Sequence, residues 1–143
     1  MKKATIIALT LATVLASCKK KSETPSSAII GRWNHDKDID MVYMDDTYYL
    51  TDTAKFTGSG EYLQFDNNLT GIYHEKDISN NSYISTAFKY TLSGVNLIIT
   101  VEGSPNPFTI KKQTDHSLIL HETSTGTFSD KTERNEIDMY YSK

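Results

Sequence analysis

Cysteine is nearly missing from this chain, since Cys18 is the only one among 143 residues. One cysteine cannot form a disulfide within the chain. Long apolar runs are also scarce. The longest covers residues 4–14, shorter than the roughly 20 residues of a membrane-spanning helix. Alanine is rare after Cys18, whereas Tyr, Thr and Ser are frequent, a composition typical of β-strands.

The N-terminal segment has the parts of a secretory signal peptide, with Lys2 and Lys3 ahead of the apolar run. Its end, Leu15-Ala16-Ser17-Cys18, resembles the lipobox of bacterial lipoproteins. The resemblance implies that residues 1–17 are removed and that Cys18 carries a diacylglycerol and an acyl chain such as palmitate. Two or more chains suffice for stable anchoring. The mature protein would then have no thiol for zinc binding or catalysis. The alternative is an ordinary signal peptide followed by a chance cysteine.

Residues 18–28 are polar and lack apolar periodicity, which indicates a flexible tether. Lys19 to Lys21 would either add attraction to anionic lipids or serve only as a hydrophilic linker. No acidic residue directly follows Cys18, so nothing resembles an inner-membrane retention signal. We expect a lipid anchor in the cell envelope, in the outer membrane, on either its periplasmic or its outer face.

Residues 29–143 are enough for one domain. The net charge of −3 argues against nucleic acid as a partner. We expect a monomer whose partners are the membrane, through Cys18, and a small hydrophobic ligand.

Short runs of alternating apolar and polar residues recur along this domain. The runs 61–66 and 69–75 flank a turn at Asn67-Asn68, and 85–92 and 95–102 flank a turn at Ser93-Gly94, so each pair predicts a hairpin. Further strands are predicted at 39–50 (one or two), 108–112, 117–122 and 133–142, with loops at 52–60 and 123–131. About eight strands with short connections predict an all-β, antiparallel up-and-down meander that closes into a barrel and so removes its edges.

The order of the motifs resembles that of the small bacterial lipocalin-like domain lipoproteins. These motifs are Gly31-Arg32-Trp33, the hairpin from Leu63 and Phe65 to Gly71, the hairpin from Phe88 to Leu97, Ile110-Lys111-Lys112, the strand 117–121, and Tyr140-Tyr141. The resemblance covers residues 29–143 and implies a lipocalin-like, calycin-type barrel without a known ligand. It also implies that Trp33 packs at the closed end of the barrel, under Arg134 or Lys143, as a marker of the fold and not as a ligand contact.

The inward faces of the predicted strands carry large apolar side chains, which either fill the barrel or line a cavity. The sequence slightly favours a mostly filled barrel. If there is a cavity, the predicted ligand-binding residues are Phe65, Phe88, Tyr90, Ile99, Phe108, Leu120, Met139 and Tyr141. A connected internal space below about 300 Å³ would argue against a ligand, because pockets normally start at that size.

Other chemistry has weak support in the sequence. His74 and His121 fall at outward strand positions and His35 and His116 in loops, so we expect solvent-facing histidines and no metal. Asp45 and Asp46 belong to an acidic cluster with Asp36, Asp38 and Asp40. The last three match the first three ligand positions of an EF-hand loop, but Met41 replaces its glycine and no helices are predicted beside it, so a solvated edge is favoured. Asp52-Thr53-Ala54 resembles a bacterial O-glycosylation acceptor.

No nucleophile elbow or phosphate-binding loop is present, so we expect no cofactor and no enzyme. The sequence favours non-enzymatic binding of a small apolar or amphipathic ligand. The alternative is a filled-barrel module of the cell envelope that binds a partner protein through residues 39–50 and 123–131.

Overall fold

The computed structural model describes residues 28–143, so the predicted signal peptide, Cys18 and most of the tether lie outside the described residues. The described part consists of nine β-strands, and the prediction of an all-β antiparallel fold is confirmed. The strands are β1 (Gly31–Met44), β2 (Thr47–Lys55), β3 (Tyr62–Phe65), β4 (Thr70–Asp77), β5 (Ser82–Ser93), β6 (Asn96–Val101), β7 (Ser104–Gln113), β8 (Ser117–Phe128) and β9 (Lys131–Ser142). No helix able to cross a membrane occurs among residues 28–143.

Eight of the strands form a closed ring. β3 to β9 pair in chain order, and β1 pairs with both β3 and β9, which closes the sheet. Every pairing is antiparallel, as expected for consecutive strands with short connections. The predicted closed antiparallel barrel of eight strands is therefore confirmed.

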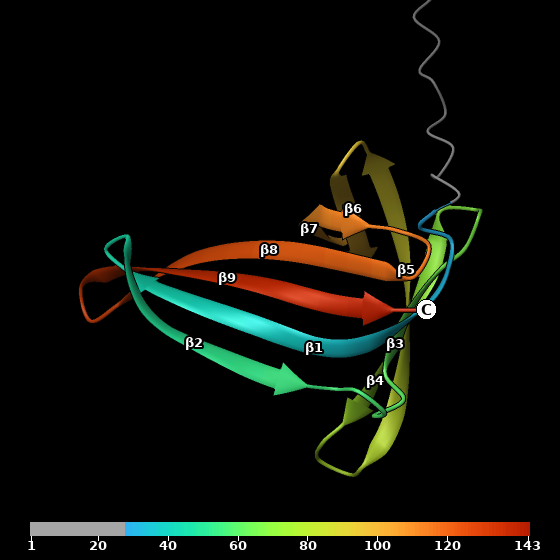
Figure 1. Ribbon diagram of the computed structural model, residues 1–143, viewed down its shortest axis with the longest axis horizontal. Coiled ribbons are helices and arrows are strands. Elements are labelled where there is room, and N and C mark those ends of the chain that lie inside the picture. The colour runs from blue at the N-terminus through green and yellow to red at the C-terminus, as the bar shows by residue number, and fades with distance from the viewer. Residues whose placement is uncertain (1–27) are drawn as a thin grey trace, which may run out of the picture.

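Strand β2 lies outside the ring because β1 changes neighbours along its length. Residues 31–34 of β1 pair with β3, whereas Lys37–Met44 pair with β2. Figure 1 shows the outer parts of β8, β9, β1 and β2 running side by side away from β3 to β7. We call this four-stranded extension, residues 37–55 and 121–138, the blade. Closure of the barrel thus leaves β2 as an exposed edge strand.

The predicted loop 52–60 is confirmed for residues 56–60, whereas the predicted loop 123–131 is wrong over most of its length. Residues 52–55 complete β2, and residues 123–128 extend β8, so that only Ser129 and Asp130 form the turn into β9. The sequence 123–127 is polar but rich in threonine, a good strand former once β9 supplies a partner strand. Asp45 and Asp46, and likewise Ser129 and Asp130, have positive φ angles, the pattern of two-residue hairpin turns.

Strand β7 is also longer than predicted, starting at Ser104 instead of Phe108. Pro105 and Pro107 pair with β6, and this half of β7 has no partner on its other side, because β8 pairs with it only from Thr109 onward. Proline is tolerated there because it needs to donate no ladder hydrogen bond on a free edge. β7 and β8 therefore separate at this level, and the barrel opens toward the blade.

The core is centred on the inward faces that alternation predicted. Its fully buried members include Trp33, Phe65, Tyr90, Leu97, Leu118 and Leu120. The Trp33 indole N–H donates to the Ile29 carbonyl at 2.7 Å, and Lys143 Nζ lies 4.2 Å from the ring centroid. Of the two candidate cations it is thus Lys143 that packs on Trp33, while Arg134 lies over Tyr43, far along β9.

Candidate functional site

The barrel interior contains a cavity of about 230 Å³ where the blade diverges from β3–β7. One wall comes from β1, β8 and β9, and the other from β3 to β7. We call it the fork cavity. It is lined by His35, Asp38, Leu63, Tyr73, Phe88, Ile99, Val101, Asn106, Phe108, Leu120, Glu122, Met139 and Tyr141.

Six of the eight predicted ligand-binding residues line the fork cavity: Phe88, Ile99, Phe108, Leu120, Met139 and Tyr141. The other two, Phe65 and Tyr90, do not. Both are buried in the core, where their rings pack edge to face at 5.1 Å and the Tyr90 hydroxyl donates to the Asp66 carbonyl at 2.7 Å. They support the cavity without reaching it.

The volume of the cavity is below the limit of about 300 Å³ set by ordinary ligand pockets. By the criterion stated above, this volume counts against a ligand enclosed by the barrel, and most of the interior is filled, as the sequence favoured. The remaining space admits only a small molecule, or one end of a longer molecule that leaves through the mouth.

His35 was predicted to be a solvent-facing loop residue, and this is wrong. It lies on β1, is 5% exposed, and is stacked between Phe56 and Tyr141 at centroid distances of 4.1 and 4.7 Å. Its Nε2 lies 2.6 Å from Asp38 Oδ1, and its Nδ1 is buried without a hydrogen-bond partner. A β-bulge between His35 and Lys37 shifts the register, so that both His35 and Asp38 face the cavity.

The polar side of the cavity is acidic. Asp38 and Glu122 line it, and the buried Glu61 and half-buried Glu75 lie nearby. Burial, followed by the negative charges of Glu75, Glu61 and Asp38, raises the pKa of Tyr73 far above its ordinary value. Burial, with the same kind of neighbours, also raises the pKa of Tyr141 well above 10. Both hydroxyls are therefore neutral hydrogen-bond donors at physiological pH.

The other acidic residues and histidines do not form a metal site. Asp36, Asp38 and Asp40 belong to strand β1 instead of a loop, so the EF-hand interpretation does not apply. Among residues 28–143 no group of three metal-ligating side chains is close enough to hold an ion. His116 is exposed in a turn, His74 accompanies Ser85 on a neighbouring strand, and Thr53 is exposed on β2.

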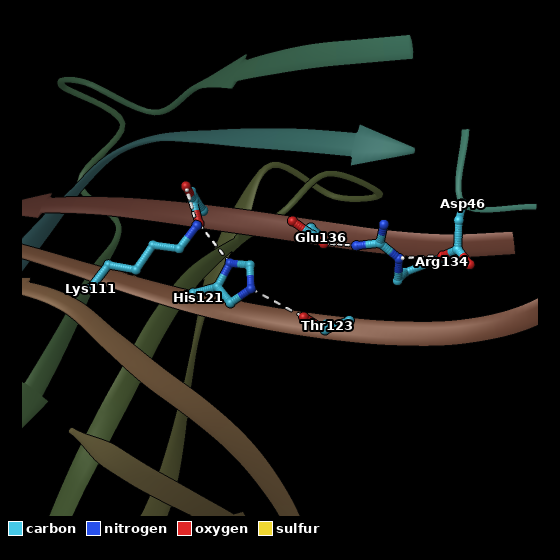
Figure 2. Close-up of polar contacts among 7 residues, drawn as sticks. Asp46, Lys111, His121, Thr123, Arg134 and Glu136 are labelled. Atoms are coloured by element: carbon cyan, nitrogen blue, oxygen red, sulfur yellow. Dashed lines mark hydrogen bonds and ion pairs between the residues drawn. The ribbon is translucent and has the colours of Figure 1, made fainter. Parts of the chain in front are cut away.

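Figure 2 shows polar contacts on the opposite face of the blade from the cavity, with His121 and Thr123 on β8 and Arg134 and Glu136 on β9. His121 contacts Asp138 at 2.7 Å, and Lys111 contacts the same carboxylate at 2.6 Å. Burial raises the pKa of Asp138, but the hydrogen bonds and charges of Lys111 and His121 lower it more, so the net shift is downward. This cluster holds Lys111 on the outer face, and no lysine or arginine lines the cavity.

A second hollow of about 680 Å³ lies over β4, β5 and β6. Much of its lining is exposed, including Ala87, Lys89 and Glu102. Because alternation places Ile72, Ala87 and Lys89 on the outer face, the hollow is a surface depression with no enclosed interior. It offers less shelter for a ligand than the fork cavity.

A closed eight-stranded antiparallel barrel with a buried first-strand tryptophan under a terminal lysine defines the class of lipocalin-like β-barrels. No protein-family model matches this sequence, and comparison with curated proteins finds no match.

Solved structures do match the fold. One is described as a lipocalin-like protein from Bacteroides uniformis ATCC 8492, with a TM-score of 0.51, 10% sequence identity, and coverage of 81% of this chain and 98% of that one. Another is an uncharacterized protein from Bacteroides eggerthii DSM 20697, with a TM-score of 0.49, 11% identity, and coverage of 80% and 98%. At such low identity the first likeness shows a shared fold and does not indicate a ligand.

Proposed function

We propose that this protein is a non-enzymatic binding protein that takes a small amphipathic molecule into the fork cavity. The observation that supports this proposal is the mixed lining of the cavity. Phe88, Ile99 and Leu120 make it apolar on one side, and His35, Asp38 and Glu122 make it polar on the other. Such a mixture, mostly apolar with a few convergent polar groups, is typical of ligand sites. The separation of β7 from β8 gives an entry route beside Asn106 and Phe108.

Native mass spectrometry of the protein purified from its own host tests this function. We expect a small-molecule adduct on the wild-type chain, and its loss in Val101→Phe, because the added ring would occupy the cavity that Val101 lines. The matched control is Ile98→Phe on the same strand, whose side chain points outward and is 39% exposed. An adduct that survives Val101→Phe as well as it survives Ile98→Phe would argue against this site.

A second candidate function, binding of a partner protein, is favoured by one observation. The segments 39–50 and 123–131 meet at the tip of the blade, where Met44 pairs with Glu133 and the Asp45 N–H donates to the Thr132 carbonyl at 2.9 Å. The tip exposes Tyr48, Tyr49 and Phe128 by 58%, 64% and 62%. The free edge of β2 would accept an extended strand of the partner. In the same mass spectra, a protein-sized partner without a small adduct would favour this function.

We further propose that Cys18 anchors the protein to the outer membrane. Cys18→Ala is expected to move the protein from the membrane to the aqueous fraction, because the thiol is the only site for the diacylglycerol. The matched control is Ser22→Ala in the tether, which should stay with the membrane. Fractionation followed by immunoblotting measures the distribution, and membrane retention of Cys18→Ala would contradict the anchor.

A further inference from the structure

We propose that the ligand of the fork cavity is a small organic cation, an amine whose ammonium group is bound by the carboxylates of Asp38 and Glu122. This inference rests on the proposed ligand-binding function and adds the chemical class of the ligand. It follows from the charges, the aromatic surfaces and an unsatisfied polar group of the cavity.

The first argument is an uncompensated negative charge. Asp38 and Glu122 flank β9 on its two sides, where Asp38 pairs with Met139 and Glu122 pairs with Ile137, and both carboxylates line the cavity. Asp38 contacts His35, but no salt bridge within residues 28–143 involves Glu122, Glu61 or Glu75. No lysine or arginine lines the cavity. A partly buried carboxylate without a basic partner, such as that of Glu122, favours a cation and disfavours a fatty acid or any other anion.

Three basic residues of the neighbouring strands are engaged on the outer face. Lys37 lies 4.6 Å from the centroid of the Tyr140 ring, and Lys111 contacts Asp138 at 2.6 Å. Arg134 lies over Tyr43 at 4.0 Å and contacts Glu136 and Asp46 (Figure 2). None of them can neutralise the inner carboxylates without leaving its own partner. These three side chains therefore leave the inner carboxylates free to meet a cationic ligand.

Aromatic surfaces supply the second argument. Tyr73, Phe88, Phe108 and Tyr141 line the same cavity as the carboxylates. Aromatic faces attract ammonium groups, and more strongly where water is excluded. A volume of about 230 Å³ suits a small amine better than a long acyl chain.

His35 supplies the third argument. Its side chain is 4% exposed, and its contact with the acceptor Asp38 places a proton on Nε2. The other ring nitrogen, Nδ1, is buried and has no hydrogen-bond partner within residues 28–143, so a polar group of a ligand could pair with it. A buried polar atom without a partner is costly, and in the neutral ring an ammonium N–H would satisfy it.

The experiment compares three probes of one shape in calorimetric titrations of the full chain. These are 2-phenylethylammonium, the neutral 2-phenylethanol and the anion phenylacetate. We expect the ammonium probe to bind at least about tenfold more tightly than the alcohol, because charged hydrogen bonds are the stronger ones. Phenylacetate should show no binding. Glu122→Gln should reduce the preference for ammonium over alcohol by about fivefold or more, with the affinity for the alcohol unchanged.

The matched control is Asp115→Asn, which removes an exposed carboxylate from the turn at the opposite end of the barrel and should leave all three affinities unchanged. Equal binding of alcohol and ammonium, or tighter binding of phenylacetate, would overturn the cation while leaving a ligand-binding cavity. An unchanged ammonium preference in both Glu122→Gln and Asp38→Asn would also overturn it. Failure of all three probes would overturn the cation as well, and the mass-spectrometric adduct then decides the proposed function separately.

Discussion

Replacing Gly71 by alanine is expected to lower the free energy of unfolding by about 3 kcal/mol, near the upper end for overpacking in a core. Gly71 is buried at the start of β4. A methyl group there would overlap the Gln64 carbonyl oxygen of β3 and the ring of Phe88. The first of these is a backbone atom in the β3–β4 ladder, which cannot move without disturbing the pairing of Gln64 with Ile72. The substitution therefore strains the sheet as well as the core.

Chemical denaturation of the purified protein measures this loss. The matched control is Gly126→Ala, because a methyl group at Gly126 meets nothing within 4 Å and its φ is not positive. That variant should change the free energy of unfolding by less than about 0.5 kcal/mol. Adding Phe88→Leu to Gly71→Ala should restore only part of the stability, because the overlap with Gln64 remains. A Gly71→Ala protein as stable as Gly126→Ala would show that the core has room at this position.

The hairpin that contains Gly71 illustrates what alternation and turn residues could predict. Leu63 and Phe65 face inward as expected, and Asn67-Asn68 form the turn. The same reasoning placed the second hairpin, with Leu92 and Leu97 buried on its inner side. In both hairpins strand, turn and partner strand are adjacent in sequence, so local patterns suffice.

Alternation predicted the blade strands at 39–50 and from 133 onward, but not the extensions 51–55 and 123–128, because these depend on partner strands rather than on an apolar face of their own. Residues 123–128 are polar and seemed to be a loop, but β9 pairs with them along their whole length. β2 has no buried residue and therefore no alternation to detect. What holds it is its backbone pairing with β1.

The polar side of the fork cavity was missed for two different reasons. Glu122 continues the alternation of Leu118 and Leu120, so its inward direction was available from the sequence. His35 likewise continues the alternation of Trp33 on β1, although it was assigned to a loop. Only Asp38 could not be placed, because the bulge after His35 inverts the alternation of β1. One unpaired residue in a strand turns all later side chains of that strand to the opposite face of the sheet. The sequence around Asp36 contains no pattern from which this bulge could be predicted.

The last expected result concerns Trp33, whose replacement by alanine should cost about 3–5 kcal/mol of stability, as is usual for large buried aromatics. The ring is fully buried, and its N–H satisfies the Ile29 carbonyl, which Trp33→Ala would leave without a donor. Trp33→Phe should fall between alanine and the wild type, since it keeps most of the packing and loses the hydrogen bond. Far-UV circular dichroism during denaturation measures both variants, because Trp33 is the only tryptophan and fluorescence is lost with it.

Lys143→Gln separates the cation above the ring from the ring itself. We expect it to cost only about 1 kcal/mol, because Lys143 is exposed and exposed cation–π contacts are weak. Trp33 does not line the fork cavity, so Lys143→Gln should keep the affinity for any ligand found there. A loss of stability as large as that of Trp33→Ala would mean that the two hydrogen-bond contacts of Lys143 Nζ with the Ala28 and Ile30 carbonyls, at 3.5 and 3.1 Å, hold the start of the domain in place. If Lys143→Gln lowered the ligand affinity without lowering the stability, the closed end of the barrel would be coupled to its mouth. We do not expect this result, because Trp33 packs apart from the cavity.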